Sequence, residues 1–264
     1  MYSGVLKKMQ TDVGHQVNYY LDLNHHFLVM NQCLGKKITL SFEGYCCLGC
    51  DAREPIFRQG FCKRCFFENP RAGEWIMRPE LSTAHLDIED RDLGYEKQVQ
   101  LQPHIVYLAL SSHLKVGITR KSQLPTRWID QGAHQAMALL EVPNRYLAGV
   151  GEVGLKELFS DKTYWRKMLQ VTDIPAVDWT TERNRAIDAL PKELKPYILH
   201  DTKLTTLNFP VEKYPTKVNS LNLVKAQQYN GILVGIKGQY LIFDDQTVFN
   251  VRSNEGLVVN LSVN

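Results

Sequence analysis

The run HIVYLAL at residues 104–110, the tripeptide SSH at 111–113 and the run LKVGITR at 114–120 decide how the centre of this chain folds. Both outer runs are rich in β-branched residues, which is typical of strands. Only three polar residues separate them, and this spacing favours a hairpin. Because side chains alternate between the two faces of a strand, we expect Lys115 to lie on the polar face of the hairpin, together with Tyr107.

The segment after the hairpin carries one arginine and one glutamate on separate elements. Arg127 follows the second strand, and the run AMALLEV at 136–142 suits a third strand. Asn144 is a suitable N-cap for a helix extending through Phe159, which places Glu152 in the middle of that helix. A tyrosine, an arginine and a glutamate from three elements can converge into a site that cuts phosphodiesters.

The expected helix is unusual because it contains glycines at 149, 151 and 154. Each glycine in a helix costs about 1 kcal/mol relative to alanine. Close approach of another backbone or of a ligand would explain them.

This order of elements resembles the GIY-YIG nuclease superfamily over about residues 103–170. Members carry a tyrosine on the first strand, a Val-Gly-x-Thr motif on the second, an arginine on a helix and a metal-binding glutamate on a later helix. The matching residues are Tyr107, Val116 to Thr119, Arg127 and Glu152. Lys115 stands where the family most often has tyrosine, and Gln131 is nearest to the usual histidine position. The whole chain also resembles a bacterial family that joins a zinc ribbon to this domain.

The resemblance implies a nuclease that depends on Mg²⁺ or Mn²⁺. Glu152 would hold the ion, Arg127 would clamp phosphate, and Tyr107 would orient or deprotonate water. A free phenol has a pKa near 10, so a cation would have to lower it, and Lys115 is the candidate. His113 is an alternative proton shuttle. The nucleic-acid-binding residues implied are Lys115, Arg120 and Arg127, and the partner implied is DNA or RNA. Taken singly, Tyr107, Arg127 and Glu152 each have a purely structural alternative.

Two CxxC pairs, separated by eleven residues, predict a metal site. Their thiolates are Cys47, Cys50, Cys62 and Cys65, and two such turns complete a closed tetrahedral zinc site of structural type. A disulfide pair is disfavoured by compartment, whereas an iron–sulfur site remains an alternative. Phe57, Phe61, Phe66 and Phe67 surround the pairs and suit a small apolar core. Cys46 is predicted to be a spare thiol and Cys33 a core residue.

Composition and charge set wide limits on function. The chain has 264 residues, of which 44% are hydrophobic and 22% charged, as in ordinary soluble proteins. It has no run of eighteen apolar residues and no apolar segment after its N-terminal charges, so we expect no membrane span, no signal peptide and a cytoplasmic location. The net charge of +3 is too small to establish a nucleic-acid partner.

Together these patterns predict an α+β fold with three parts. These are a GIY-YIG-like α/β domain, a zinc ribbon and a small β-module formed from N- and C-terminal strands. The predicted segments are N-terminal strands at 1–43, the ribbon at 44–70, a loop-like linker at 71–102, the GIY-YIG-like domain at 103–170, a helical connection at 171–204 and the C-terminal β-module at 205–264. Pro191 and Pro196 are expected to interrupt the helices of the connection.

Three classes of function follow. The first is a zinc-containing, nucleic-acid-processing protein that hydrolyses phosphodiesters. The second is a catalytically inactive nucleic-acid-binding module, and the third is a protein-interaction scaffold. The sequence gives neither the oligomeric state nor the choice between DNA and RNA.

Overall fold

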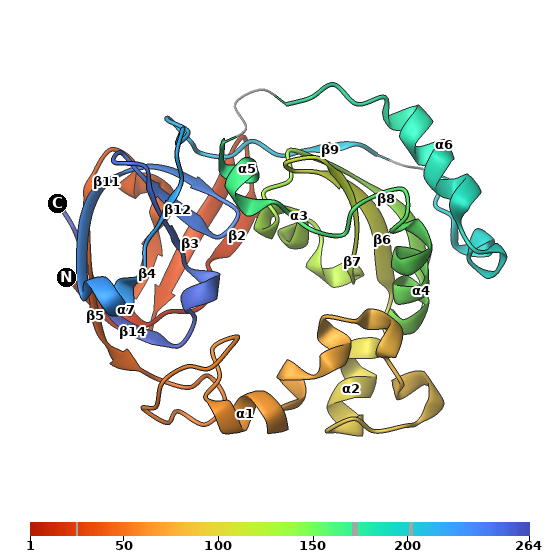
Figure 1. Ribbon diagram of the computed structural model, residues 1–264, viewed down its shortest axis with the longest axis horizontal. Coiled ribbons are helices and arrows are strands. Elements are labelled where there is room, and N and C mark those ends of the chain that lie inside the picture. The colour runs from red at the N-terminus through yellow and green to blue at the C-terminus, as the bar shows by residue number, and fades with distance from the viewer. Residues whose placement is uncertain (25, 171–173, 201–202) are drawn as a thin grey trace.

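The computed structural model describes residues 1–24, 26–170, 174–200 and 203–264. Within these residues the protein is a mixed α+β structure with a seven-stranded, a four-stranded and a three-stranded sheet, which confirms the predicted fold class. Figure 1 shows the seven-stranded sheet at one end of the long axis and the four-stranded sheet at the other, with α1 below and α5 above the space between them. In this described part no helix has the length and apolar character needed to cross a membrane.

Strands from both ends of the chain build one sheet, as the sequence predicts. In the order β1-β14-β5-β11-β12-β13-β10, its members are β1 (Tyr2–Val5), β14 (Leu257–Val263), β5 (Lys37–Tyr45), β11 (Gln228–Lys237), β12 (Tyr240–Phe243), β13 (Thr247–Asn250) and β10 (Asn219–Ser220). A small sheet of β2 (Gln10–Val13), β3 (Val17–Leu23) and β4 (His26–Val29) packs into the same core. A turn at Gly238 joins β11 to β12 with a φ of 62°, which glycine adopts without strain. We call these two sheets the β-module.

The predicted hairpin and third strand are confirmed. The four-stranded sheet has the order β7-β6-β8-β9, with β6 (His104–Leu110), β7 (Leu114–Arg120), β8 (Gln135–Val142) and β9 (Thr205–Thr206). Asn144 caps α4 (Arg145–Leu155) by accepting a hydrogen bond from the Leu147 N–H at 2.9 Å. The helix ends four residues before Phe159, because the chain turns there to bury Phe159 and to pair Ser160 with Lys115 of β7.

The two faces of the hairpin contribute to different cores. One face, with Val106, Leu108 and Val116, packs against α4. The other face, with Tyr107, packs against Trp128 of α3 (Thr126–Asp130) and belongs to the core of the β-module. The α/β unit and the β-module therefore share one continuous core, which fixes their relative position.

The segment predicted as a loop-like linker at 71–102 is instead largely short helices. It contains α2 (Leu93–Gln100) and several 3-10 turns, and the fully buried Glu96 organises it. The Glu96 carboxylate accepts hydrogen bonds from the backbone N–H groups of Asp90, Arg91 and Asp92 at 2.7 to 3.1 Å. The polar composition of residues 71–102 predicted a loop. The buried Glu96 carboxylate instead stabilises short helices there, because it accepts hydrogen bonds from the backbone.

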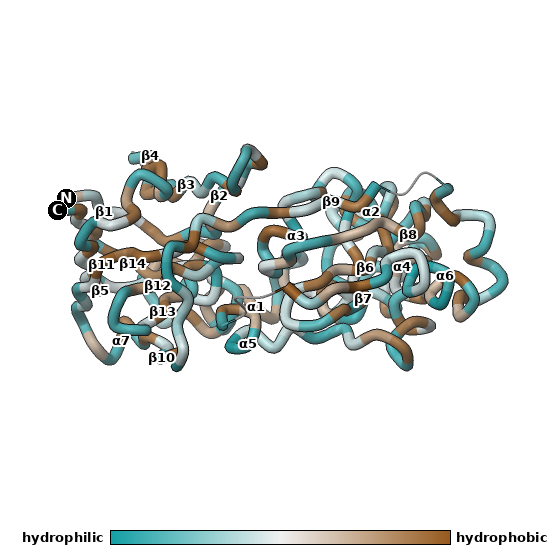
Figure 2. The backbone as a smooth tube through the Cα atoms, turned by 90° about the horizontal axis from the view of Figure 1, so that it is seen from above, coloured by the Kyte–Doolittle hydropathy of each residue, from teal (hydrophilic) through white to brown (hydrophobic). Residues whose placement is uncertain are grey.

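The remaining helices lie along the connections. They are α1 (Lys63–Glu68), α5 (Trp165–Gln170), α6 (Trp179–Ala189) and α7 (Leu223–Ala226). The 3-10 helices are Met30–Cys33, Pro70–Ala72, Glu74–Ile76, Pro79–Leu81, Ala84–Leu86, Lys121–Gln123, Lys192–Tyr197 and Arg252–Asn254. As expected, α6 ends before Pro191, but Pro196 lies inside a 3-10 helix rather than interrupting it. Seen from above, α6 lies at the outer end of the α/β unit, and α5 lies between that unit and the β-module (Figure 2).

Candidate functional site

The four predicted cysteine ligands come together in one cluster. The sulfur atoms of Cys47, Cys50, Cys62 and Cys65 all lie within 4.8 Å of one another. The Cys50 and Cys62 sulfurs are 3.9 Å apart. Tetrahedral bonds of about 2.3 Å to zinc would place sulfurs roughly 3.8 Å apart, so the cluster has the dimensions of a four-thiolate site. It can therefore bind a zinc ion.

The charges of the cluster fit a cation. Burial alone would raise the pKa of Cys47, but hydrogen bonds from the N–H groups of Cys62, Gly49 and Cys50 outweigh it and lower this pKa to about 6. Hydrogen bonding with Cys50, together with burial, raises the pKa of Cys65 to about 12. Four sulfurs this close cannot all be thiolates without a positive charge between them, which a bound divalent ion supplies.

The ribbon's predicted apolar core forms only in part. Phe61 is buried and Phe66 packs against the cysteines. Phe57 and Phe67 are 43% and 57% exposed, so they lie outside that core. Arg71 holds the ribbon from outside by donating to the Leu48 carbonyl at 2.5 Å and lying 5.1 Å from the Phe61 ring centre.

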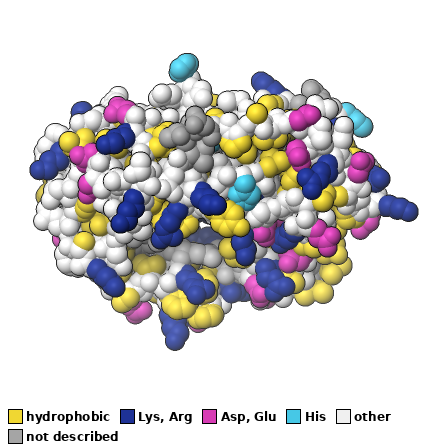
Figure 3. All heavy atoms as spheres, turned by 45° about the horizontal axis from the view of Figure 1, so that its top comes forward, with side chains coloured by type: hydrophobic (Ala, Val, Ile, Leu, Met, Phe, Trp, Pro, Cys, Tyr) yellow, Lys and Arg dark blue, Asp and Glu magenta, His cyan; other side chains and the backbone are white. Residues whose placement is uncertain are grey.

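A cleft of about 880 Å³ lies between the ribbon, the α/β unit and the β-module. Figure 3 shows the molecule hollowed near its centre, with lysine and arginine side chains around the hollow. The cations that line the cleft are Arg58, Arg71, Lys115, Arg127 and Arg252, and the acids are Asp130, Asp161 and Glu255. Of the cations, only Arg252 has a carboxylate within 4 Å among the described residues, at 3.6 Å from Asp130. The cleft is therefore electropositive.

Tyr107 lies beneath the floor of this cleft. Its side chain is fully buried, and its hydroxyl donates a hydrogen bond to the Gln131 side-chain oxygen at 3.0 Å. The ring covers Gly117, where an added Cβ would lie 2.7 Å from the Tyr107 hydroxyl oxygen. Burial raises the pKa of Tyr107, and the charge of Arg127 offsets only part of this rise. The expectation that Lys115 lowers this pKa is wrong, because Arg127 is the cation that acts on the phenol and burial dominates.

Lys115 lies on the face of the hairpin that the strand alternation predicts. It pairs with Ala109, two residues along β6 from the Tyr107–Gly117 pair, and it lines the cleft although only 2% exposed. Burial lowers its pKa to about 8, with a further contribution from the charge of Arg127. The charge of Glu152 opposes this lowering. In the part of the chain that the structure describes, Lys115 is thus a cation without an ion-paired carboxylate.

Arg127 and Glu152 approach the same place from different helices. Arg127, in α3, lines the cleft, whereas Glu152, in α4, is half-buried and is not a lining residue. Burial raises the pKa of Glu152, and the charge of Asp161 adds to the rise. Arg145 lies nearby and donates to the carbonyls of Trp75 and Ile76 at 3.1 and 2.8 Å. The charges of Arg127 and Glu152 therefore influence the pKa values of Tyr107 and Lys115. Of these four predicted catalytic residues, only Lys115 and Arg127 line the cleft.

The packing of α4 explains one of its unusual glycines. A Cβ at Gly149 would lie 2.6 Å from the Pro79 carbonyl carbon and would also overlap the Glu80 backbone. The expected close approach of another backbone is thus confirmed at this position. Because residue 149 has no side chain, the segment at Pro79 and Glu80 packs closely against α4, the helix that carries Glu152.

Two other predicted residues lie away from the cleft. Arg120 pairs with His104 at the far end of β7 and is not a lining residue. His113 bonds the Ser112 hydroxyl at 2.9 Å and packs its ring 4.9 Å from Tyr164. Burial lowers the pKa of His113, and it does not line the cleft either.

The sequence interpretation missed several residues that the structure brings to the cleft. One is Asp161, whose charge acts on the pKa of Lys115. The others are Arg58 and Arg71, from the ribbon and the segment after it, and Arg252 from the β-module. Asp161 pairs with Lys156 at 3.2 Å. The sequence interpretation gave Gln131 no role beyond being nearest to the usual histidine position. Its position four residues after Arg127 is the signal in the sequence that could have identified it as the partner of Tyr107.

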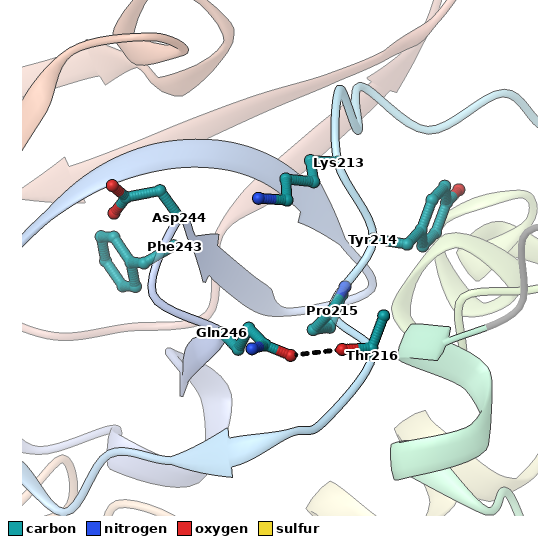
Figure 4. A pocket seen from close by; sticks show the side chains of 7 residues that line it. All are labelled: Lys213, Tyr214, Pro215, Thr216, Phe243, Asp244 and Gln246. Atoms are coloured by element: carbon teal, nitrogen blue, oxygen red, sulfur yellow. Dashed lines mark hydrogen bonds between the residues drawn. The ribbon is translucent and has the colours of Figure 1, made fainter.

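A smaller cavity of about 140 Å³ lies in the β-module (Figure 4). Its lining residues are Lys213, Tyr214, Pro215, Thr216, Phe243, Asp244 and Gln246. The Thr216 hydroxyl donates to the Gln246 side-chain oxygen at 2.7 Å across it. None of these residues lines the larger cleft, and its two charged residues, Lys213 and Asp244, are exposed to solvent. The larger cleft is the better candidate site.

Comparison with known proteins adds one match. A family model described as "Protein of unknown function (DUF2797)" matches residues 35–259. No curated protein and no solved structure matched the chain. The matched residues span the cysteine cluster and the cleft.

Proposed function

The chain belongs to the family described as Protein of unknown function (DUF2797), and we propose that it is a nucleic-acid-processing protein whose central cleft hydrolyses phosphodiesters with the aid of Mg²⁺ or Mn²⁺. The observation that carries the proposal is that Lys115 and Arg127 line the electropositive cleft, while the charges of Arg127 and Glu152 act on the pKa values of both Tyr107 and Lys115. The strand order β7-β6-β8, with the tyrosine on the central strand, supports the likeness to GIY-YIG nucleases.

In this proposal each side chain has a definite task. Lys115 and Arg127 bind the phosphoryl oxygens, because both line the cleft and neither has an ion-paired carboxylate among the residues that the structure describes. Tyr107 is protonated at neutral pH, so its hydroxyl, held by Gln131, orients water or a phosphate oxygen and does not act as a resting base. Lys115, with a pKa of about 8, stays mainly protonated at neutral pH and therefore acts as a cation that binds phosphate.

Glu152 and Asp161 suit a divalent cation. Burial raises the pKa of Glu152 and the charge of Asp161 adds to the rise, and hard cations prefer carboxylate oxygens with water and phosphate oxygens. Bound there, Mg²⁺ or Mn²⁺ would neutralise charge on the phosphate and acidify water.

We propose further that the cysteine cluster holds a structural zinc ion. Four thiolates leave no open position for water, so this ion would take no part in hydrolysis. Its task would be to keep the ribbon, with Arg58 and Arg71, in place as one wall of the cleft.

The rival proposal is a binding module without catalysis. Two observations favour it: Tyr107 has no exposed surface, and Glu152 does not line the cleft. In that case the cations alone would hold the nucleic acid.

The deciding experiment incubates purified protein with Mg²⁺ or Mn²⁺ and labelled single- and double-stranded DNA and RNA. Glu152→Gln should abolish cleavage while leaving affinity within about twofold, since it removes a metal ligand and no cation. Glu157→Gln is the matched control, because Glu157 is exposed just beyond the same helix. Binding without cleavage in the wild type would favour the binding module, and cleavage that persists in Glu152→Gln would refute this site.

A further inference from the structure

One wall of the cleft is a stack of planar side chains. The rings of Trp165 from α5 and Tyr240 from β12 lie 5.5 Å apart at an angle of 8°, and both line the cleft. The guanidinium of Arg166 lies 4.2 Å from the Trp165 ring centre on the same stack. Aromatic rings and guanidinium groups of this kind are surfaces on which nucleobases stack, because every base has a π-face.

The ribbon provides a second aromatic surface on another wall. Phe57 is 43% exposed and lines the cleft, and the Arg58 guanidinium lies 5.5 Å from its ring centre. An exposed aromatic ring beside a cation matches the alternation of bases and phosphates along a single strand.

The cations Lys115 and Arg127 line the same cleft as these two surfaces. Lys115 is only 2% exposed, so a phosphate reaches it only by entering the cleft. The volume of about 880 Å³ is that of a small-ligand site. A space of about 880 Å³ is roughly 10 Å across, which is less than the width of the major groove of DNA, about 12 Å, and so less than the width of the whole double helix.

We propose that the cleft takes single-stranded nucleic acid, stacking bases on Phe57 and on the Trp165–Tyr240 pair while phosphates approach Lys115 and Arg127. The placement of the phosphates rests on the proposed function. The stacking surfaces do not, because they come from the ribbon, α5 and β12 rather than from the hairpin.

The test is fluorescence anisotropy with labelled oligonucleotides of one sequence, as single-stranded DNA, single-stranded RNA and the corresponding duplexes. The full chain is used without added Mg²⁺ or Mn²⁺, so that binding is measured apart from cleavage. We expect single strands to bind more tightly than duplexes. Phe57→Ala and Trp165→Ala should each weaken single-strand binding by roughly 5- to 150-fold.

Matched controls separate stacking from structural damage. Phe67→Ala removes a neighbouring exposed ring, 5.8 Å from Phe57, that does not line the cleft, and it should leave affinity unchanged. Trp165→Phe keeps a ring in the stack and should restore most of the affinity lost in Trp165→Ala.

The outcomes distinguish this inference from the proposed function. Ring-dependent single-strand binding with no cleavage of any substrate supports the inference and refutes hydrolysis. Duplex binding as tight as single-strand binding, or wild-type affinity in both Phe57→Ala and Trp165→Ala, overturns the inference even if Glu152-dependent cleavage is seen. Absence of binding to every oligonucleotide overturns both.

Discussion

The hydroxyl of Tyr107 donates a hydrogen bond to the side-chain oxygen of Gln131 at 3.0 Å, beneath the wall that Lys115 and Arg127 form. Gln131, which is nearest to the position where GIY-YIG nucleases usually have a histidine, thus holds Tyr107 in place. The bond needs the phenol proton, and burial keeps the pKa of Tyr107 above its ordinary value. The hydrogen bond and the burial therefore favour the same protonation state.

The first prediction concerns this pair. Tyr107→Phe should cost only about 0.5–1.5 kcal/mol of unfolding free energy, because the ring packing is kept and one hydrogen bond is lost. Turnover, if hydrolysis occurs, should fall by about tenfold or more, because a group that orients the reacting atoms is lost. Denaturant unfolding and initial rates measure the two effects. A large stability loss with unchanged turnover per folded molecule would assign Tyr107 a structural role alone.

The second prediction concerns zinc. Purified protein should contain about one zinc per chain, and Cys62→Ser should lose it together with the order of the ribbon, since metal binding and folding are coupled. Metal analysis by mass spectrometry and the thermal midpoint measure these effects. Cys46→Ser is the control, because Cys46 is not part of the cluster. Zinc well below one equivalent in the wild type, or iron in its place, would contradict the prediction.

The third prediction compares two arginines. Arg127→Ala should weaken nucleic-acid binding and reduce the slope of affinity against salt by about one counterion. Arg120→Ala, at the end of β7 outside the cleft, should have the smaller effect if the cleft is the binding site. Titrations at several salt concentrations provide both slopes. Equal losses in the two variants would extend the binding surface to the Arg120 end of the hairpin.

The fourth prediction concerns Lys115. Lys115→Ala should lower turnover by more than it weakens binding if the residue stabilises charge in the transition state. In a binding module it should weaken affinity alone and reduce the salt slope by about one. Single-turnover rates and affinities, measured side by side, separate the two. If neither quantity changes, this placement of the site is wrong.

The fifth prediction is a pH dependence of stability from Lys237, which joins β11 to the α/β unit. Its amino group is fully buried, 2.6 Å from the ring nitrogen of His134 and 2.8 Å from the Met168 carbonyl. Burial lowers the pKa of Lys237 to about 7. Between about pH 7 and the ordinary value near 10.4, the unfolded chain binds the proton that the folded chain has released, so this group adds stability as pH rises.

The measurement is denaturant unfolding of the wild type and of Lys237→Met from pH 7 to pH 10. The wild type should gain stability relative to the variant across this range, by a few kcal/mol at most, on the order of 1.4 kcal/mol per pH unit. A flat difference between the two proteins would show that Lys237 remains protonated in the folded state.

Local sequence was sufficient for the elements whose cause is local. The spacing of the two CxxC pairs places four thiols around one point, because each short turn fixes two of them. The hairpin and the Asn144 cap likewise depend on residues close in the chain, and the structure has both. The sharing of one sheet by N- and C-terminal strands was also predicted from the strand-like runs at the two ends of the chain.

Tertiary structure alone decided the features that join distant residues. Glu96 became the buried centre of a segment that reads as a solvated loop, because three N–H groups compensate its desolvation. The cleft exists because one face of the hairpin packs into the core of the β-module and so fixes Lys115 and Arg252 around one space. Burial then set the protonation of Tyr107 and Lys115, and burial is a property of the assembled core that no spacing in the sequence encodes.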